Sequence, residues 1–190
     1  LDFGKIHSNW KFLIENFIEP YHVQFVHKTT TKQPLRDHYT IVDDTCLGSG
    51  VDVKEENSDK KTLSVSSRYL SLFPNFIIGS YFPNQIGVYL NVPLGPGLTT
   101  QKRIIYTTEG KTMSEQEIEL QKKIWWDVHK EDHEICERLQ EGRSSPASDK
   151  GGLLSPHWEK SVQAFHKLVL SATMRNYKKM KGKKNAQRSK

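Results

Sequence analysis

The sequence predicts an α+β domain in which helices cover one face of an antiparallel sheet. Three observations predict it: a helical apolar period near the N-terminus, a strand-like alternation in the middle, and two amphipathic helices toward the C-terminus. With 190 residues, the chain fits one domain and is long enough to bury a core. No apolar run approaches the ~20 residues that a membrane span needs.

The first helix is expected within residues 10–27, where apolar residues recur every three to four positions. These apolar residues are Trp10, Leu13, Ile14, Phe17, Ile18 and Tyr21. Either Ser8 or Asn9 is a suitable N-cap. Pro20 predicts a bend or a break, because proline lacks a backbone N–H and clashes with the preceding turn.

The middle of the chain is predicted to be β structure. From Gln85 to Pro93, apolar residues alternate with polar or small ones, a period typical of a strand with one buried face. Shorter alternations indicate further strands, at Val51 and Val53, Leu63 and Val65, and Ile104 and Tyr106. Turn residues are found at positions 48–50, 57–59 and 93–97. Strands in series without helices between them favour antiparallel pairing.

Two helices are predicted after these strands. Ser114 and Glu117 have the spacing of a capping box, and the helix that follows is expected to end near Gln140. Its apolar residues include Ile118, Leu120, Ile124, Trp125, Val128, Ile135, Cys136 and Leu139. The second helix is expected from Pro156 to Ala172 and has one apolar face.

The charge is distributed unevenly along the chain. The formal net charge is +6, yet residues 174–190 hold eight Lys or Arg and no acid, so the rest carries −2. Such a tail can bind nucleic acid or anionic lipid. No basic–aromatic interleaving accompanies it, so we expect a solvated, partly disordered tail after a body of residues 1–173, with neither nucleic acid nor membrane as a partner.

The densest chemistry lies around two histidines, His22 and His27, with Glu15 and Glu19 upstream. Imidazole is a common ligand of iron, zinc and copper. Residues five apart differ by about 140° around a helix, so both rings can face one metal only if the helix bends or ends between them. The alternative is a pair of polar residues at a helix end, hydrogen-bonded to backbone.

A second cluster of charges spans residues 127–134. One carboxylate from it would complete a set of two histidines and one carboxylate, which leaves positions open on Fe(II) for O₂ and substrate. Zinc with a bound water is the rival metal, and composition does not choose between them. The alternative for most of this run is a solvated helix face.

Several runs, in order, resemble the catalytic domain of Rieske oxygenase α subunits. The entry to that domain is matched by Asn9-Trp10-Lys11, Glu15-Asn16, Glu19, Tyr21-His22 and His27. Leu72-Phe73-Pro74-Asn75 resembles the family's central strand, Glu131-Asp132 to Gly142 its late helix, and Gly152-Leu153-Leu154-Ser155 to His166 its closing helix. The likeness extends from Ile6 to about Thr173.

The resemblance implies that His22, His27 and Asp132 bind one mononuclear Fe(II). Glu131 and Asp127 are the alternative ligands if the register differs.

Glu19 matches the family's acidic residue that links the cluster histidine of a neighbouring subunit to an iron-ligand histidine. A carboxylate bonded to His22 would fix the ring's tautomer and offer a route for electrons. Asn16, one turn earlier on the same side, is expected to support this site.

The family's catalytic domain has a helix-grip fold, a curved antiparallel sheet wrapped around a long helix. The implied reaction is insertion of oxygen from O₂ into an organic substrate, with electrons from a reductase or ferredoxin by way of a [2Fe–2S] Rieske cluster. The only cysteines, Cys46 and Cys136, lie far apart, so this chain does not bind that cluster. We expect the Rieske domain in an N-terminal part that this chain lacks, a homotrimer, and a reducing cytoplasm.

The substrate is expected to be an aromatic or a quaternary ammonium compound. Glu19 stands where many ring-hydroxylating members carry Asp, and this favours the quaternary ammonium branch. An aromatic cage would suit such a cation. Its candidate walls are Phe73, Tyr81, Phe82, Trp125 and Trp126. Two alternatives stay open: a metal-free helix-grip ligand carrier and a zinc hydrolase.

Overall fold

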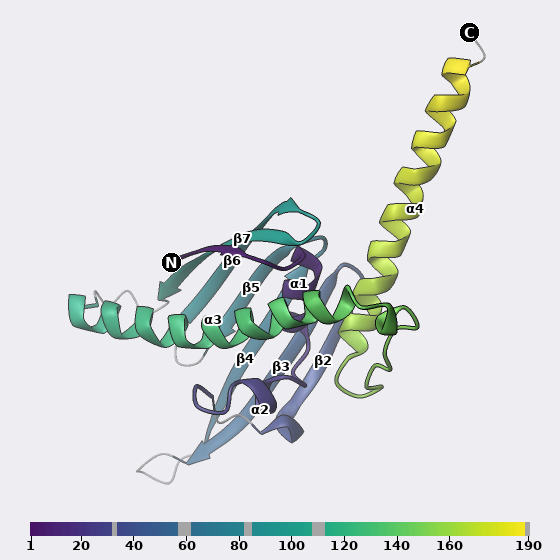
Figure 1. The fold of residues 1–190 in the computed structure, drawn as a ribbon. Coiled ribbons are helices and arrows are strands. Elements are labelled where there is room, and N and C mark those ends of the chain that lie inside the picture. The colour runs from purple at the N-terminus through teal and green to yellow at the C-terminus, as the bar shows by residue number, and fades with distance from the viewer. Residues whose placement is uncertain (32–33, 57–61, 82–84, 108–112, 189–190) are drawn as a thin grey trace.

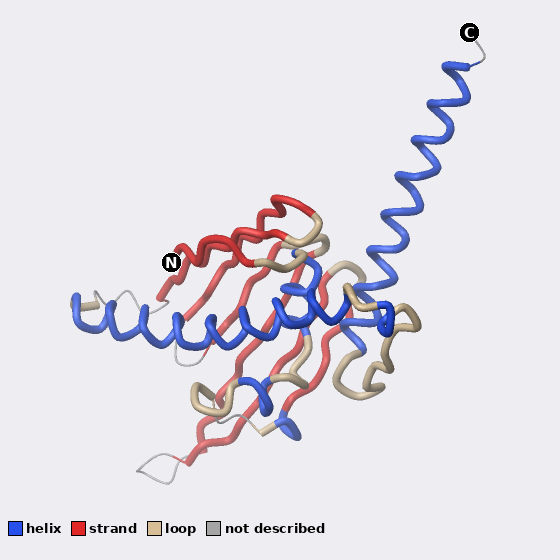
Figure 2. Tube along the Cα trace, viewed as in Figure 1, coloured by secondary structure: helices blue, strands red, loops and turns tan. Residues whose placement is uncertain are grey.

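The computed structural model describes residues 1–31, 34–56, 62–81, 85–107 and 113–188. In these ranges it has a seven-stranded sheet of order β1-β7-β6-β5-β4-β3-β2 with helices packed on it (Figures 1 and 2). The strands are β1 (Asp2–Ile6), β2 (His38–Asp43), β3 (Cys46–Glu56), β4 (Thr62–Leu72), β5 (Phe76–Tyr81), β6 (Gln85–Gly95) and β7 (Leu98–Thr107). Every neighbouring pair is antiparallel, which confirms the predicted class.

The strands expected from periodicity are present as β3, β4, β6 and β7. The predicted turn at residues 48–50 is wrong, because these residues lie inside β3. A Cβ on Gly48 would lie 1.9 Å from the carbonyl oxygen of Tyr69. Glycine at this position therefore lets β3 and β4 lie close together. Residues 73–75 are also not a strand but the connection between β4 and β5. The predicted turn at 57–59 falls outside the described residues.

Pro20 ends the first helical segment as predicted. Helix α1 (Trp10–Ile18) starts after Asn9, whose side chain accepts a hydrogen bond from the backbone N–H of Lys11. The one-turn helix α2 (Val23–Val26) follows the proline. Helix α1 packs directly on the sheet, and this places the α1–α2 break beside it.

Helix α3 (Glu115–Arg143) begins with the predicted capping box between Ser114 and Glu117. It crosses the same face of the sheet as α1 and packs on α1 and α2 (Figure 1). Its buried residues are only His129 and Cys136. Several of its apolar residues are exposed, because α1 rather than α3 covers much of the sheet. They are Ile118, Leu120, Ile124 and Leu139.

Helix α4 (Lys160–Arg188) is longer than the sequence suggests. We predicted its end near Ala172, whereas the helix continues to Arg188. The partial disorder expected of residues 174–190 stays a prediction. Lysine and arginine are good helix formers, and no proline or acid interrupts the run. Its first turns pack near β2 and β3, and the rest projects from the body (Figure 1). Two short 3₁₀ turns, Leu35–Asp37 and Pro146–Ser148, complete the elements.

The main core lies between the sheet, α1 and the start of α4. It consists of Ile14, Ile18, Leu47, Ile77, Tyr89, Val162 and Phe165. A smaller cluster of Ile6, Leu13 and Cys136 joins β1, α1 and α3. Within the described ranges, no helix combines the length and the apolar character needed to cross a bilayer.

Replacing Phe165 by Ala should lower the free energy of unfolding by about 3–5 kcal/mol, because its buried ring contacts Trp10 and Phe73 and would leave a cavity. The matched control is Leu170→Ala on the exposed side of α4. This substitution should change the free energy of unfolding by less than about 0.5 kcal/mol. Urea unfolding followed by circular dichroism measures both. Equal losses in the two variants would contradict this core.

Candidate functional site

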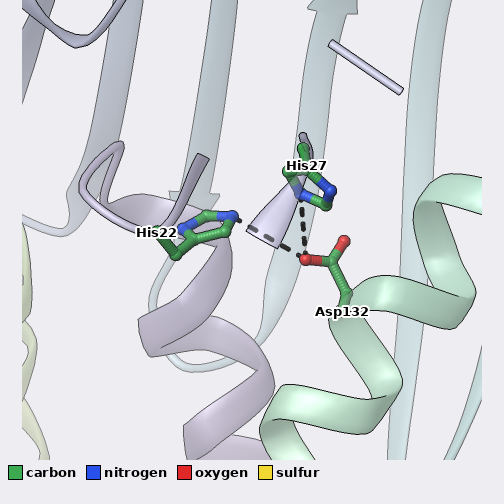
Figure 3. Close-up of side chains that lie close together, drawn as sticks. All are labelled: His22, His27 and Asp132. Carbon is green, nitrogen blue, oxygen red and sulfur yellow. Dashed lines mark ion pairs between the residues drawn. The ribbon is translucent and has the colours of Figure 1, made fainter. Parts of the chain in front are cut away.

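Three predicted residues meet where the α1–α2 break faces α3 (Figure 3). Asp132 Oδ1 lies 3.2 Å from His27 Nε2 and 3.7 Å from His22 Nε2. One ligand atom from each of the three residues lies within 4.8 Å of the others. This spacing is compatible with one shared metal ion, and in the described residues no other such group of three is found.

The helix break at Pro20 explains how two histidines five residues apart can face the same point. His22 is the N-cap of α2, and His27 is its C-cap with φ −87° and ψ 46°, outside helical geometry. Because the helix lasts only one turn between them, the rings are not held about 140° apart. Their centroids are 5.2 Å apart, and both Nε2 atoms face Asp132.

Each histidine is oriented by its own carboxylate. His22 Nδ1 donates to Glu19 Oε1 at 2.6 Å, and His27 Nδ1 donates to Glu131 Oε2 at 2.8 Å. These bonds leave both Nε2 atoms unprotonated in the neutral rings, as metal ligation requires. The carboxylates also fix tautomer and ring orientation. The sequence suggested Glu19 for this role but not Glu131.

Both orienting carboxylates are themselves held in place. Glu19 accepts from the backbone N–H groups of Tyr21 and His22. Glu131 accepts from the hydroxyls of Thr29 at 3.1 Å and Thr30 at 2.6 Å. The Thr-rich segment after His27 therefore has a structural use that its sequence did not reveal.

The other sequence candidates occupy different places. Asn16, expected to support the site, donates from Nδ2 to Asp132 Oδ1 at 2.8 Å and so orients that carboxylate. Asp127 pairs with Lys123 at 2.7 Å on the exposed side of α3, away from both histidines. Tyr21 stacks on Trp158 at 5.8 Å, which favours a packing role.

The electrostatics of the site favour a bound cation. Burial alone would raise the pKa of Asp132, but the hydrogen bond and charge of His27, the charge of His22 and the Asn16 amide lower it to about 2. Burial alone would lower the pKa of His27, but Asp132 and then Glu131 raise it to about 9. Asp132 thus stays ionised, and it stabilises a positive charge beside it, which is either the second proton of His27 or a metal ion that takes that proton's place on Nε2.

A cavity adjoins the site between α1, α3 and the inner face of the sheet. It is lined by Leu13, Asn16, Phe17, Ile77, Tyr89, Gln101, His129, Asp132, His133 and Cys136. The α3 members His129, Asp132 and Cys136 share one helix face through their spacing of three and four residues. From the sequence we expected most residues of the charged run 127–134 to face solvent. The spacing of three and four residues is the signal that could have indicated a buried face.

The candidate walls of an aromatic cage do not enclose an open site. Trp125 and Tyr81 stack on the guanidinium of Arg103. Their ring centroids lie 3.3 and 4.8 Å, respectively, from Arg103 Cζ. Trp126 packs edge-on against Phe3. Phe73 packs against Phe165, and Phe82 lies outside the described residues.

Together the fold and the site define an α+β domain whose two histidines and one carboxylate converge beside an internal cavity. The chain belongs to the family described as ring hydroxylating alpha subunit (catalytic domain), whose model matches residues 4–174. The family resemblance inferred from the sequence is thereby confirmed.

The chain is also similar to named proteins. Chloroplastic choline monooxygenases of Atriplex hortensis and Spinacia oleracea are 30% and 29% identical over 85% and 84% of this chain. The chain spans only 36% of the length of each.

Solved structures support the fold. The quaternary ammonium Rieske monooxygenase CntA matches with a TM-score of 0.72 and 18% identity, over 87% of this chain and 47% of that one. Dicamba monooxygenase bound to 3,6-dichlorosalicylic acid matches with a TM-score of 0.69 and 14% identity, over 92% and 58%.

Glu131→Gln should weaken binding of a divalent metal about 10- to 100-fold, because the carboxylate that orients His27 is replaced by a neutral amide. Glu134→Gln on the exposed face of the same helix is the matched control and should leave affinity unchanged. Anaerobic competition with a chromophoric chelator measures both. Equal affinity of the Glu131 variant and the parent chain would contradict the orienting role.

Proposed function

We propose that His22, His27 and Asp132 hold one Fe(II) and that the chain is the catalytic domain of a terminal oxygenase, which inserts oxygen from O₂ into an organic substrate. The observation that carries this proposal is the convergence of three ligand atoms within 4.8 Å in a chain of this family.

The donor set fits ferrous iron. Two neutral imidazoles and one carboxylate on one side of an ion leave its other positions open, the arrangement typical of non-haem iron oxygenases. A small cavity of about 20 Å³ lies beside Asp132. Iron held by these three ligands would supply the redox chemistry with dioxygen.

The protein residues prepare that chemistry. Glu19 and Glu131 accept hydrogen bonds from Nδ1 of His22 and His27. With a metal bound, this leaves both Nε2 lone pairs free to face the ion. Asn16 holds one oxygen of Asp132.

Electrons would arrive from outside this chain. Glu19 is bonded to His22, and in our proposal it links that ring to a donor on a neighbouring subunit. We propose that the donor is a [2Fe–2S] Rieske cluster, supplied in turn by a reductase or ferredoxin, in a homotrimer. Cys46 and Cys136 are both free thiols in this chain and bind no such cluster in our proposal.

The substrate would be a small quaternary ammonium or aromatic compound. The relatives' names include choline monooxygenase and a quaternary ammonium monooxygenase, and a more distant structure is bound to an aromatic acid. The compartment remains a prediction: we expected the cytoplasm, whereas the choline monooxygenases are described as chloroplastic.

Metal analysis of chain purified without oxygen tests the proposal. We expect about one iron per chain, lost in His22→Ala because one of three protein ligands is removed. His157→Ala, an exposed histidine that packs on Trp158, is the matched control and should keep its iron.

Two other results of the same analysis would overturn the proposal. Stoichiometric zinc, together with hydrolytic activity that needs no electrons, would indicate the zinc hydrolase. Absence of any metal, with the same thermal stability in His22→Ala as in the parent, would indicate a ligand carrier.

A further inference from the structure

Helix α4 carries positive charge that the rest of the chain does not neutralise. From Lys160 to Arg188 it has nine lysines and arginines and no Asp or Glu. Those within residues 160–181 are all exposed, and none of them pairs with a carboxylate of the described residues. The one ion pair of this part of the helix joins His166 to Glu15, at 3.1 Å. The helix therefore presents a basic surface that has no acidic partner within the described chain.

The same helix also exposes a row of apolar side chains. Its packing against the core ends at Val169. Four large apolar residues then follow with exposed fractions of 62, 46, 53 and 62%, namely Leu170, Met174, Tyr177 and Met180. At 100° per residue they fall within about 120° of the helix circumference, over about 15 Å of its length. We call these four residues the apolar row of α4.

The apolar row does not continue the side of α4 that packs on the body. Leu170 follows the buried Phe165 by five residues, which places the two side chains about 140° apart around the helix. Beyond residue 170 the helix projects from the body (Figure 1). In the described structure the row therefore has no protein surface against it.

Lysines border the apolar row. Lys181 Nζ lies 5.5 Å from the ring centroid of Tyr177, and Lys178 is one residue beyond that tyrosine. Long lysine side chains can lie along apolar groups and still hold their ammonium groups at the rim. A helix with an apolar strip and lysines beside it is typical of helices that lie in the plane of a membrane surface.

The charge and the apolar row together select among possible occupants. A second copy of α4 would bring the same positive charge and no acid to balance it, so two copies repel each other. Nucleic acid would pair with the lysines and leave the apolar row in water. A surface of anionic lipid accepts both features, because its headgroups attract lysine and the boundary of its acyl chains takes up apolar side chains.

We propose that α4 binds the surface of membranes that contain anionic lipid, with the apolar row at the boundary between headgroups and acyl chains. The helix lies on the membrane and does not cross it. From the sequence alone we expected no membrane partner, because the apolar residues of this segment are scattered among lysines. Folding into one helix places them on one side. The inference is independent of the iron site.

Co-sedimentation of the chain with sucrose-loaded vesicles tests this inference. One set of vesicles is phosphatidylcholine alone, and the other contains about one quarter phosphatidylglycerol. We expect binding to the anionic vesicles to be at least about 10-fold tighter, because each lysine or arginine near the surface is attracted to it. Salt at about 0.5 M should remove most of the difference, since it shortens the Debye length to about 4 Å.

Two variants separate the apolar row from the charge. Leu170→Gln combined with Tyr177→Gln should weaken binding to anionic vesicles about 10-fold, because apolar surface no longer leaves water. Its matched control replaces two exposed apolar residues outside α4, by Leu94→Gln and Leu120→Gln, and should bind as the parent does.

The charge variant replaces three exposed lysines of α4 and should weaken binding about 10- to 100-fold. It carries Lys178→Gln, Lys179→Gln and Lys181→Gln. Its control removes the same charge from exposed lysines of the body and should change binding by about twofold at most, because those charges lie beyond the Debye length from α4. The control carries Lys5→Gln, Lys28→Gln and Lys150→Gln. Circular dichroism and a thermal melt show that each variant keeps the fold.

Four results would overturn the inference. Equal binding to both kinds of vesicle would remove the role of anionic lipid. Anionic binding that survives substitution of the apolar row would reduce the contact to charge alone. Binding to a short DNA duplex without binding to anionic vesicles would assign the helix to nucleic acid. Self-association that is lost in the Leu170 and Tyr177 variant, without vesicle binding by the parent, would assign the row to a second copy of the chain.

Discussion

The arrangement of the site depends on one carboxylate, that of Asp132, which α3 presents to a segment more than a hundred residues earlier in the sequence. It lies near both Nε2 atoms and accepts from Asn16, so a single group ties α1, α2 and α3 together. Opposite charges at this spacing attract strongly when partly buried. The same negative charge that a metal would balance therefore also fixes how α3 lies over α1.

Charge is separated along the interior. At one end, Glu19, Glu131 and Asp132 surround two imidazoles and favour a cation. At the other, Arg103 is buried among aromatic rings and favours an anion.

Local signals in the chain account for the elements that were predicted well. The break at Pro20, the Asn9 cap, the capping box at Ser114 and the alternation of β6 are decided by neighbouring residues. The failures have physical causes as well. The glycines of β3 resemble a turn in the sequence, but in the sheet Tyr69 of β4 lies against Gly48 and Tyr39 of β2 lies against Gly50. The inner face of α3 cannot be identified from its apolar residues, because α1 covers much of the sheet.

The sequence by itself determined the class of fold, the family and the two histidines with their break, since proline and residue order act locally and a series of motifs is specific. Only the tertiary structure decided that Glu131 orients His27 instead of serving as a spare ligand, and that Trp125 and Tyr81 enclose Arg103. Those partners come from strands and helices distant in sequence. Which side chain neutralises or orients another depends on packing, and no spacing along the chain encodes it.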